Sequence, residues 1–311
     1  MVKYYIKTGA EKMREIETAE KGCWIYLESP TKDEIARTAE KTGIPAHFIA
    51  GATDEEEQAR IESEDGNLLV LIDIPKGVDR EGKRHIETIP MGIIMNDSYF
   101  VTVCVRRTSV LDDFLKQKFG AFDTSKQRKL LYHVLYNVFT RFLFYLRTID
   151  KAGNDIQKNI AKTMKNDELL ELVDLQKSLV FFSASLSANH AVVQKIINGS
   201  ASKNTPDEKE LLDDVLIETR QAIEMCAIYR EIIKNSMDAF SSIANNNMNL
   251  IMKFLTAITI VLSIPMIIAG YWGMNTGVPW ESKMYGFWIA VGISVVLSVV
   301  TLIYFIRKKM L

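Results

Sequence analysis

Cysteine is scarce in this sequence, and its arrangement excludes one class of metal site. The three cysteines, Cys23, Cys104 and Cys226, lie far apart in apolar-rich stretches, and no Cys-x-x-Cys pair or His/Cys cluster occurs. We therefore expect reduced cysteines that pack in the interior, and no zinc site. The four histidines are isolated from one another along the chain, which favours surface or packing roles for them.

Motifs of catalysis and of nucleotide binding are also missing. No glycine-rich phosphate loop follows any of the expected strands, and no Ser/His/Asp spacing stands out. Lysine and arginine do not form blocks interleaved with aromatic residues, so nucleic-acid binding has little support. The sequence therefore predicts neither an enzyme nor an organic cofactor.

Charge is nearly absent from two long apolar runs near the C-terminus. The first, Leu250–Trp272, contains one formal charge, Lys253, and the second, Gly286–Ile306, contains none and ends at the basic residues 307–309. As a helix with a rise of about 1.5 Å per residue, either run covers a hydrocarbon core of roughly 30 Å. A pair of buried core helices is the alternative, and the run length with its basic end favours a membrane hairpin.

The same absences predict the topology. No apolar segment lies at the N-terminus, so we expect no cleavable signal peptide, and residues 1–247 are expected in the cytosol. The positive-inside rule keeps the tail, 307–311, cytoplasmic, and two spans, 248–272 and 286–306, return the chain to that side. The outer loop, 273–285, then faces outside a cell membrane, inner or plasma.

Residues 1–106 alternate between strand and helix signals and predict a small α/β domain. A capping box, Thr31-x-x-Glu34, opens an amphipathic helix that Gly43 and Pro45 stop. Turn signals occur at 75–77 and 96–98. Strands are expected at 24–27, 68–74, 89–95 and 99–105.

From residue 107 to 204 helical periodicity replaces the strand signals. A short helix is expected at 110–118, and two long segments, 125–164 and 167–198, are expected to pair antiparallel until Gly199–Thr205 breaks the second. Packing seams are expected along both long helices. They comprise Leu130, Leu131, Val134, Leu135, Val138 and Phe139 on the first, and Leu169, Leu172, Leu175, Leu179 and Phe182 on the second.

A last, very long helix begins at Thr205, the expected N-cap, with Pro206 at its first position and acids in its first turn. Neither glycine nor proline occurs from there to Ser263, so a stalk, 205–247, is expected to continue into the first span. The expected fold class is an α/β cytosolic domain plus long helices and a two-helix transmembrane hairpin, assembled as an oligomer.

Two spans per chain cannot enclose a pore, so transport requires an oligomer with first spans around an axis. Candidates for the lining recur at three- or four-residue spacing and form a stripe that is polar at both ends and mostly apolar between. The alternative is that small and hydroxyl residues only let helices pack closely in lipid. The stripe comprises Asn249, Met252, Leu255 or Thr256, Thr259, Ser263, Met266 and Gly270.

The sequence Tyr271-Trp272-Gly273-Met274-Asn275 resembles the aromatic-Gly-Met-Asn signature of the CorA family of magnesium transporters, and it has the expected place between two spans. Asn249-x-x-Met252-Lys253-x-Leu255-Thr256 is similar to the family's pattern at the inner start of the pore helix. Upstream, Trp24-x-x-Leu27-x-x-Pro30-Thr31-x-x-Glu34 resembles the N-terminal domain. Asp214-Val215 matches an Asp-Val pair on the family's stalk helix.

This resemblance implies a funnel-shaped homopentamer that takes up magnesium, with cobalt and nickel as further candidate ions. Asn275 would form the outer selectivity ring, with Gly273 and Met274 shaping its loop. Asn249, Met252, Leu255 and Met266 would line the pore, the apolar ones as a gate. Met266 falls where some members carry threonine, which argues against a polar way-station in mid-pore.

Physical chemistry supports an asparagine ring independently of the resemblance. Magnesium dehydrates reluctantly, and an amide carbonyl can accept hydrogen bonds from its water shell without stripping it. A neutral carbonyl also permits release, which conduction requires. A divalent ion gains roughly 4.6 kcal/mol per 100 mV of inside-negative potential, twice the single-charge figure, so no ATP site is needed.

Regulation by cytosolic magnesium would use acids that repel until a divalent cation neutralises them. Asp214 matches the family's stalk position for this role, and Glu64 and Asp65 lie just before a strand where partner acids often occur. Ile217 and Glu218 replace a commonly seen Asp-His, so the site is expected to be altered. Solvated surface charges are the alternative for all of these acids.

In the outer loop, Glu281 beside Lys283 is a candidate for concentrating cations. Two other functions remain open. A zinc transporter of the same superfamily is the first, although that branch commonly changes the middle residue of the motif, and Met274 is retained here. A membrane-anchored helical scaffold that transports nothing is the second, and it leaves the stripe and Asn275 unexplained.

Overall fold

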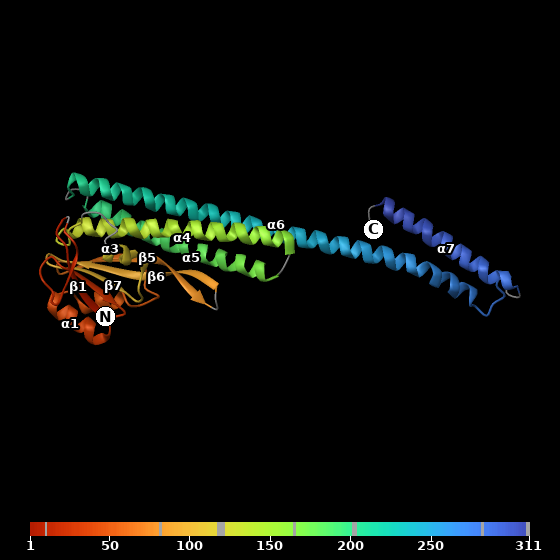
Figure 1. Ribbon diagram of the computed structural model, residues 1–311, viewed down its shortest axis with the longest axis horizontal. Helices are drawn as coiled ribbons and strands as arrows, with labels where there is room; N and C mark the ends of the chain where they lie inside the picture. Colours follow the sequence, from red (N-terminus) through yellow and green to blue (C-terminus); the bar gives the residue numbers. More distant parts are fainter. Residues whose placement is uncertain are drawn as a thin grey trace. The chain divides into compact units, whose positions relative to one another are not determined.

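The computed structural model describes residues 1–9, 11–80, 83–116, 122–163, 166–200, 204–280 and 283–308 (Figure 1). The chain divides into two compact units, Met1–Asn235 and Ser236–Leu311. The first unit contains a sheet covered by helices, and the second contains a helical hairpin. This agrees with the predicted fold class of an α/β domain, long helices and a C-terminal pair of apolar helices.

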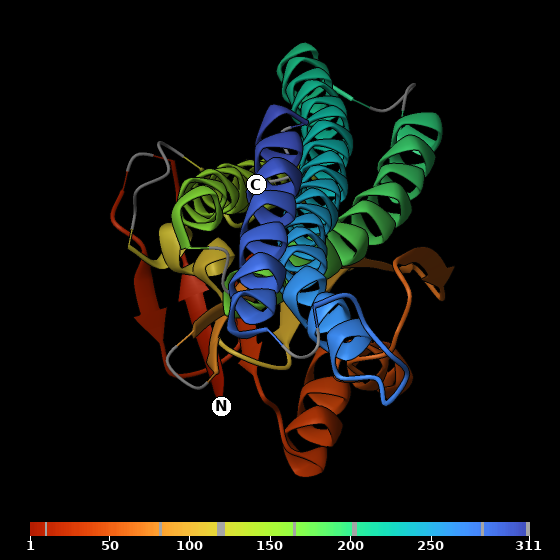
Figure 2. The same cartoon turned by 90° about the vertical axis from the view of Figure 1, so that its right-hand side faces the viewer.

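A seven-stranded sheet forms the base of the first unit, in the order β2-β1-β3-β7-β6-β5-β4. β3 and β7 pair in parallel at its centre, and the remaining neighbours are antiparallel. Figure 2 shows the strands gathered on one side of the long helices. The strands are β1 (Val2–Ile6), β2 (Arg14–Ile16), β3 (Trp24–Glu28), β4 (Arg60–Glu64), β5 (Asn67–Arg80), β6 (Lys83–Met95) and β7 (Phe100–Cys104).

The two central strands are apolar on both faces because both faces are covered. Every residue of β7 is buried, and in β3 only Glu28 is not. The indole of Trp24 in β3 donates to Thr102 Oγ1 in β7 at 2.8 Å, so the large buried ring keeps its polar atom satisfied. These strands match two of the predicted segments.

Helices α1 (Lys32–Thr42) and α2 (Ala46–Gly51) pack on one face of the sheet. The predicted capping box is present, since Thr31 Oγ1 accepts from the Glu34 amide and Glu34 accepts from the Thr31 amide. Gly43 ends α1 with φ of 72°, a conformation that favours glycine. The helix α2 was not predicted, because it is short and lies directly after the stop signals.

The turn predicted at residues 75–77 is wrong, because these residues lie inside β5, where Pro75 pairs with Thr88. β4 pairs with β5 only as far as Leu71, so the remaining edge of β5 has no neighbouring strand in the part of the chain that the structure describes. A proline without an N–H group costs no ladder bond at such an edge. The proline in this segment therefore marks a free strand edge and not a turn.

Side chains of two long helices form hydrogen bonds with the backbone groups along that edge of β5. Asn189 of α5 accepts from the Asp73 amide at 2.9 Å and donates to the Asp73 carbonyl at 2.8 Å. The Gly77 amide donates to Tyr145 Oη of α4 at 3.1 Å. β5 and β6 are therefore longer than predicted, since two helices replace a neighbouring strand.

The helical part of the unit contains α3 (Ser109–Leu115), α4 (Gln127–Thr163), α5 (Asn166–Ser200) and the start of α6 (Pro206–Trp272). The predicted packing seams of α4 and α5 are confirmed, with Leu169 and Leu175 only half-buried. Phe142 and Phe182 meet edge to face across the pair at 4.9 Å. α5 ends at Ser200, inside the range Gly199–Thr205 where a break was predicted.

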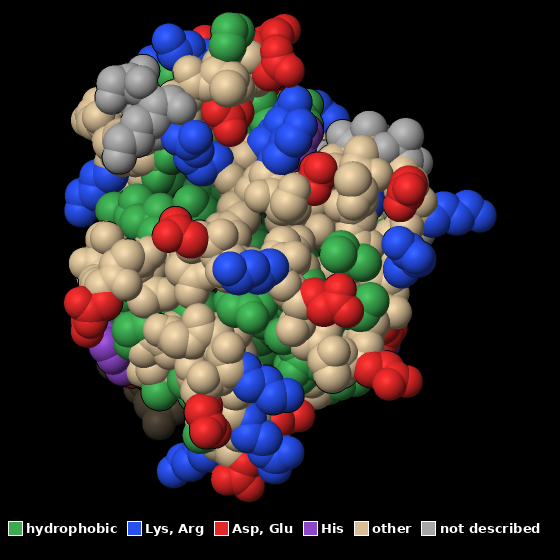
Figure 3. Space-filling view, turned by 90° about the vertical axis from the view of Figure 1, so that its left-hand side faces the viewer, with side chains coloured by type: hydrophobic (Ala, Val, Ile, Leu, Met, Phe, Trp, Pro, Cys, Tyr) green, Lys and Arg blue, Asp and Glu red, His purple; other side chains and the backbone are tan. Residues whose placement is uncertain are grey.

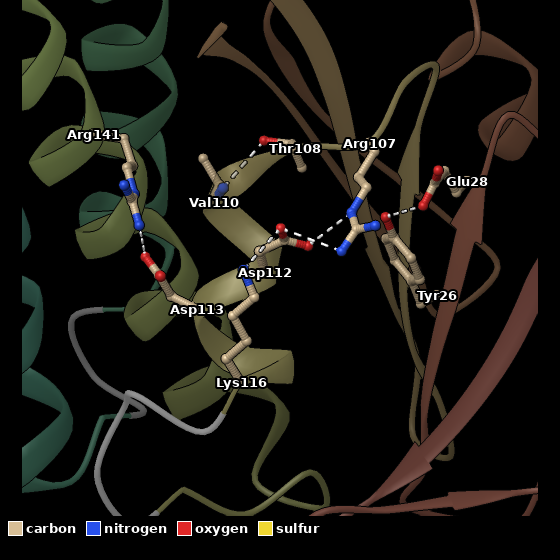
Figure 4. Close-up of polar contacts among 9 residues, drawn as sticks. All are labelled: Tyr26, Glu28, Arg107, Thr108, Val110, Asp112, Asp113, Lys116 and Arg141. Carbon is tan, nitrogen blue, oxygen red and sulfur yellow. Dashed lines mark hydrogen bonds and ion pairs between the residues drawn. The ribbon is translucent and has the colours of Figure 1, made fainter. Parts of the chain in front are cut away.

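Ion pairs join α3 to the segment before it and to α4 (Figure 4). Arg107 Nε lies 3.2 Å from Asp112 Oδ1, and Asp113 pairs with Arg141 of α4. Beside them, burial raises the pKa of Tyr26, whose hydroxyl donates to Glu28 at 2.8 Å. These charged side chains are therefore paired with other groups of the same unit.

The three cysteines are free and buried, as predicted. Burial raises the pKa of the Cys226 thiol to about 11. The face of the first unit in Figure 3 carries basic and acidic side chains intermixed, with no block of one sign.

Candidate functional site

Helix α6 is a single element from Pro206 to Trp272, as the absence of helix breakers predicted. At its start, Thr205 is the N-cap as predicted, and Glu208 completes a capping box that was not predicted. The Thr205 amide donates to Glu208 Oε2 at 2.8 Å, and the Glu208 amide donates to Thr205 Oγ1 at 3.4 Å. The helix also continues through Pro265, which lacks the N–H group for the carbonyl one turn earlier.

The second unit contains the end of α6 and α7 (Met284–Arg307). Both helices are long and apolar enough to cross a membrane, and only 6% and 11% of the most apolar window of each is buried. The core helix of a soluble protein would be mostly buried. The exposure of both helices therefore favours spans over the alternative of buried core helices.

The less exposed side of α7 carries small residues. Gly286 and Ser294 are buried there, and Ala290, Ser298 and Thr301 are half-buried at three- or four-residue spacing. Small side chains at this spacing let two helices approach closely in lipid. On α6, the less exposed residues of the second unit include Ala257, Val261, Ile264 and Ile268.

The predicted stripe lies on the other side of α6. At 3.6 residues per turn, about 100° per residue, its mean direction is roughly opposite that of these less exposed residues. Met252, Leu255 and Met266 are 53%, 55% and 75% exposed. Ser263 is half-buried, whereas Asn249, Thr256, Thr259 and Gly270 are exposed. Within one chain the stripe is therefore uncovered, and it is not the contact between α6 and α7.

The hydroxyl groups of the stripe are already used as donors. Thr256 donates to the Met252 carbonyl at 2.7 Å, Thr259 to Leu255 at 2.8 Å, and Ser263 to Thr259 at 2.7 Å. A hydroxyl oxygen that donates its proton still has acceptor lone pairs. These residues can therefore present acceptors to a hydrated cation.

One segment of α6 is uncovered on its whole circumference. Every residue from 241 to 256 is exposed, including Ile243, Met248, Ile251 and Phe254. Half of the segment is polar, with Asn245, Asn246, Asn247 and Lys253 among its residues. Its large exposed apolar side chains are typical of a surface that lipid or another protein covers.

The loop after α6 carries the Gly-Met-Asn motif. The Gly273 amide donates to the Ala269 carbonyl at 2.9 Å and closes the last helical turn. A Cβ on Gly273 would lie 3.2 Å from that carbonyl oxygen, so a larger residue would strain the turn. Met274 and Asn275 follow and are exposed, and the Asn275 amide has no partner among the described residues.

The loop returns to α7 through a tight contact that the sequence reasoning missed. Trp280 has φ of 63°, which is uncommon for a bulky residue. Its carbonyl accepts from the Lys283 amide at 3.0 Å and lies against Gly286, the second residue after the start of α7. The four-residue spacing of the small residues Gly286, Ala290, Ser294 and Ser298 could have predicted the less exposed side of α7. No pattern in the sequence indicated the contact with Trp280.

The predicted regulatory acids are separate in the single chain. Asp214 is exposed on α6, Glu64 ends β4, and Asp65 lies in the β4–β5 turn with φ of 48°. His47 Nε2 lies 3.1 Å from Glu64 Oε2. In the described parts of the chain, no three His, Cys, Asp or Glu side chains are placed to hold a metal ion. Glu281 lies outside the described residues, as does Lys309 of the basic tail.

The sequence model of a protein family described as CorA-like Mg²⁺ transporter protein matches residues 19–308. The chain belongs to this family. The cobalt/magnesium transport protein CorA of Methanocaldococcus jannaschii is 26% identical over 295 residues, 92% of this chain and 90% of that protein.

Solved structures share the fold of this CorA-like chain. The complete CorA magnesium transporter from Methanocaldococcus jannaschii has a TM-score of 0.85 at 23% identity, covering 100% of this chain and 99% of that one. The ZntB cytoplasmic domain from Vibrio parahaemolyticus has a TM-score of 0.60 at 10% identity, covering 78% and 98%. Membership of the CorA-like family makes this a membrane protein, with α6 and α7 as its candidate spans.

Proposed function

We propose that this CorA-like chain is the subunit of a homopentameric channel that takes up Mg²⁺, with Co²⁺ and Ni²⁺ as further ions. The observation that carries the proposal is the position of the stripe, which is exposed and roughly opposite the α7 contact. Several copies of α6 can turn this face toward a common axis while α7 lies outside. One chain alone cannot enclose a path.

The residues of the stripe and loop have distinct proposed roles. Asn275, whose side-chain amide has no partner among the described residues, would accept hydrogen bonds from the water shell of the ion, and Gly273 and Met274 would hold the loop that presents it. Met252, Leu255 and Met266 would form apolar constrictions that close by dewetting. Asn249, Thr256, Thr259, Ser263 and Gly270 would complete the lining.

Orientation and driving force follow from charge. The basic end of α7, including Arg307 and Lys308, is proposed to lie in the cytoplasm, as are both termini. A divalent ion then gains roughly 4.6 kcal/mol per 100 mV on entry, twice the single-charge figure. The membrane potential is sufficient to drive uptake.

The proposal assigns a role to each segment of the chain. Residues 1–106 and 107–204 would form the cytosolic domain, 205–247 the stalk, 248–272 and 286–306 the spans, and 273–285 the outer loop, with 307–311 as the tail. Magnesium would also be the regulatory ion.

Because the acids are not clustered in one chain, the regulatory site would form between subunits. Asp214 of one copy would approach Glu64 and Asp65 of the next. Glu281 would draw cations toward the outer loop.

Uptake into proteoliposomes tests the function. The full chain is reconstituted with an inside-negative potential, and entry of Mg²⁺, Co²⁺, Ni²⁺ and Zn²⁺ is followed with an indicator in the lumen. The proposal predicts potential-dependent Mg²⁺ entry. Entry of Zn²⁺ without Mg²⁺ would support the zinc transporter instead, and entry of no ion would support the scaffold.

A further inference from the structure

An apolar groove lies between the outer ends of α6 and α7. It has a volume of about 1080 Å³, and its walls come from α6, the returning loop and α7. From Pro265 to Gly273 it extends about 12 Å along α6 at 1.5 Å per residue, close to half of a hydrocarbon core of roughly 30 Å. Its depth therefore matches one leaflet of a bilayer.

The composition of the groove changes along its length. Ile268, Val291 and Val295 make the deeper part apolar, whereas Lys283 lies at the loop end. Trp272, Trp280 and Trp288 also line it. Tryptophan gathers at the boundary between hydrocarbon and headgroups. The groove thus has a hydrocarbon part and a cationic part in the order found in a lipid leaflet.

Two polar groups of the groove lack partners among the described residues. The Trp272 Nε1 atom is buried and has no hydrogen-bond acceptor among the described residues. The Lys283 side chain is exposed, and no ion pair of it is found in the described part of the chain. A buried indole N–H normally has an acceptor. An indole donor and an ammonium group together suit the oxygens of an anionic headgroup.

The side of α6 on which the groove lies indicates which molecule meets it. This inference rests on the proposed function. On a helical wheel, the groove residues Pro265, Ile268, Ala269 and Trp272 point about 150° from the mean direction of the stripe. If the stripe faces the pore axis, the groove opens toward lipid and not toward the axis. A membrane lipid is then the molecule that meets it.

We propose that the groove is a binding site for an anionic membrane lipid of the outer leaflet. Its hydrocarbon chain would lie along α7 near Val291 and Val295. Its phosphate would interact with Lys283, and the Trp272 side chain would rotate so that Nε1, which is buried in the structure, donates to an oxygen near the headgroup. Because the same groove is bounded by Gly273 and Trp280, the lipid would support the loop that carries Asn275.

Tryptophan quenching by brominated lipids tests the site. The full chain, with Trp288→Phe, is reconstituted in phosphatidylcholine vesicles that contain brominated phosphatidylglycerol or brominated phosphatidylcholine. Trp24 is buried in the first unit and gives a constant background. The remaining indoles, Trp272 and Trp280, both line the groove. We expect anionic lipid to quench at about fivefold lower mole fraction, the factor for about 1 kcal/mol per lysine at a membrane surface.

Matched variants localise the effect. Lys283→Gln should abolish the anionic preference, whereas Lys308→Gln, which removes the same charge at the other end of α7, should retain it. Ala269→Phe fills the groove and should reduce quenching by both lipids, whereas Ile293→Phe, outside the groove on α7, should not. Equal quenching by both lipids, or equal effects of the two lysine variants, would overturn the proposal.

Two further outcomes separate this proposal from its alternatives. Absence of quenching by any brominated lipid would mean that a second copy of the chain covers the groove, which also overturns it. The quenching assay needs no ion, so Asn275→Ala should retain the anionic preference. If the preference holds in a chain that takes up no Mg²⁺, only the proposed function is wrong, and uptake without preference refutes only the lipid site.

Discussion

The carbonyl oxygen of Trp280 lies 2.7 Å from the position that a Cβ atom on Gly286 would occupy. The loop that carries the Gly-Met-Asn motif therefore returns to α7 through a contact that only glycine permits. Trp280 adopts its left-handed conformation at the same point. Strained residues of this kind persist where the surrounding structure fixes them.

Replacing Gly286 with alanine should displace the loop. Because the added methyl group meets backbone and not a flexible side chain, overpacking should cost about 1–3 kcal/mol or move Trp280. We expect a severalfold loss of Mg²⁺ uptake in proteoliposomes. Gly292→Ala is the matched control on α7, since nothing lies within 4 Å of its added Cβ. Equal uptake by the two variants would show that the contact does not position the loop.

Asn189→Ala should destabilise the first unit. The change removes both hydrogen bonds to the backbone of Asp73, and each unsatisfied group costs on the order of 1–3 kcal/mol. Thermal unfolding of the full chain, followed by circular dichroism, should show a lower midpoint. Asn198→Ala, at an exposed position of α5, should leave the midpoint unchanged. A midpoint like that of the native chain would mean that the edge of β5 needs no helix partner.

Asp73 should make stability depend on pH. Burial raises the pKa of its carboxyl above the ordinary value of 3.8, although a hydrogen bond with Ser185 opposes the shift. The folded state binds the proton more tightly than the unfolded state, so this contribution is present below pH 3.8 and is lost as the pH rises through the raised pKa. Asp73→Asn should therefore gain stability at pH 7 relative to the native chain, and the gain should shrink toward pH 4.

The measurement for Asp73 is the unfolding midpoint across this range. Asp213→Asn, at an exposed position of α6, serves as the control and should show no such trend. A difference between Asp73→Asn and the native chain that stays constant with pH would contradict the assignment.

Asp214→Ala should weaken closure by internal magnesium. Removing one anionic contact should raise the inhibitory concentration about tenfold, the factor for 1.4 kcal/mol. Uptake is measured in proteoliposomes loaded with increasing Mg²⁺. Asp213→Ala removes the neighbouring exposed acid and should keep the native inhibition curve. Identical curves for Asp214→Ala and the native chain would exclude Asp214 from regulation.

Local signals predicted the parts of the fold that depend on neighbours in sequence. The capping box of Thr31 and Glu34, the left-handed Gly43 and the long α6 all follow from residues within one or two turns. The polar strand β4, Arg60–Glu64, was missed because its strand character comes from pairing with β5. Pro75 was misread because the sequence does not show which edge of a strand is free.

In the candidate site, too, the sequence predicted the local features and not those that depend on distant parts of the chain. Three- and four-residue spacing predicted the stripe on α6, but small residues occur on both faces of this helix. The position of α7 opposite the stripe therefore required the structure. Asp214 and Glu64 are in separate places in one chain, so no property of a single subunit brings them together. The Trp280–Gly286 contact depends on a loop conformation that composition does not specify.

The central claim is that Asn275 forms the outer selectivity ring of a magnesium pore. Its most direct measurement is potential-driven Mg²⁺ uptake by the native chain and Asn275→Ala in identical proteoliposomes, with Thr276→Ala as the neighbouring exposed control. The account predicts that Asn275→Ala loses uptake at least tenfold while Thr276→Ala retains it. Mg²⁺ uptake by Asn275→Ala at the native rate would contradict the account.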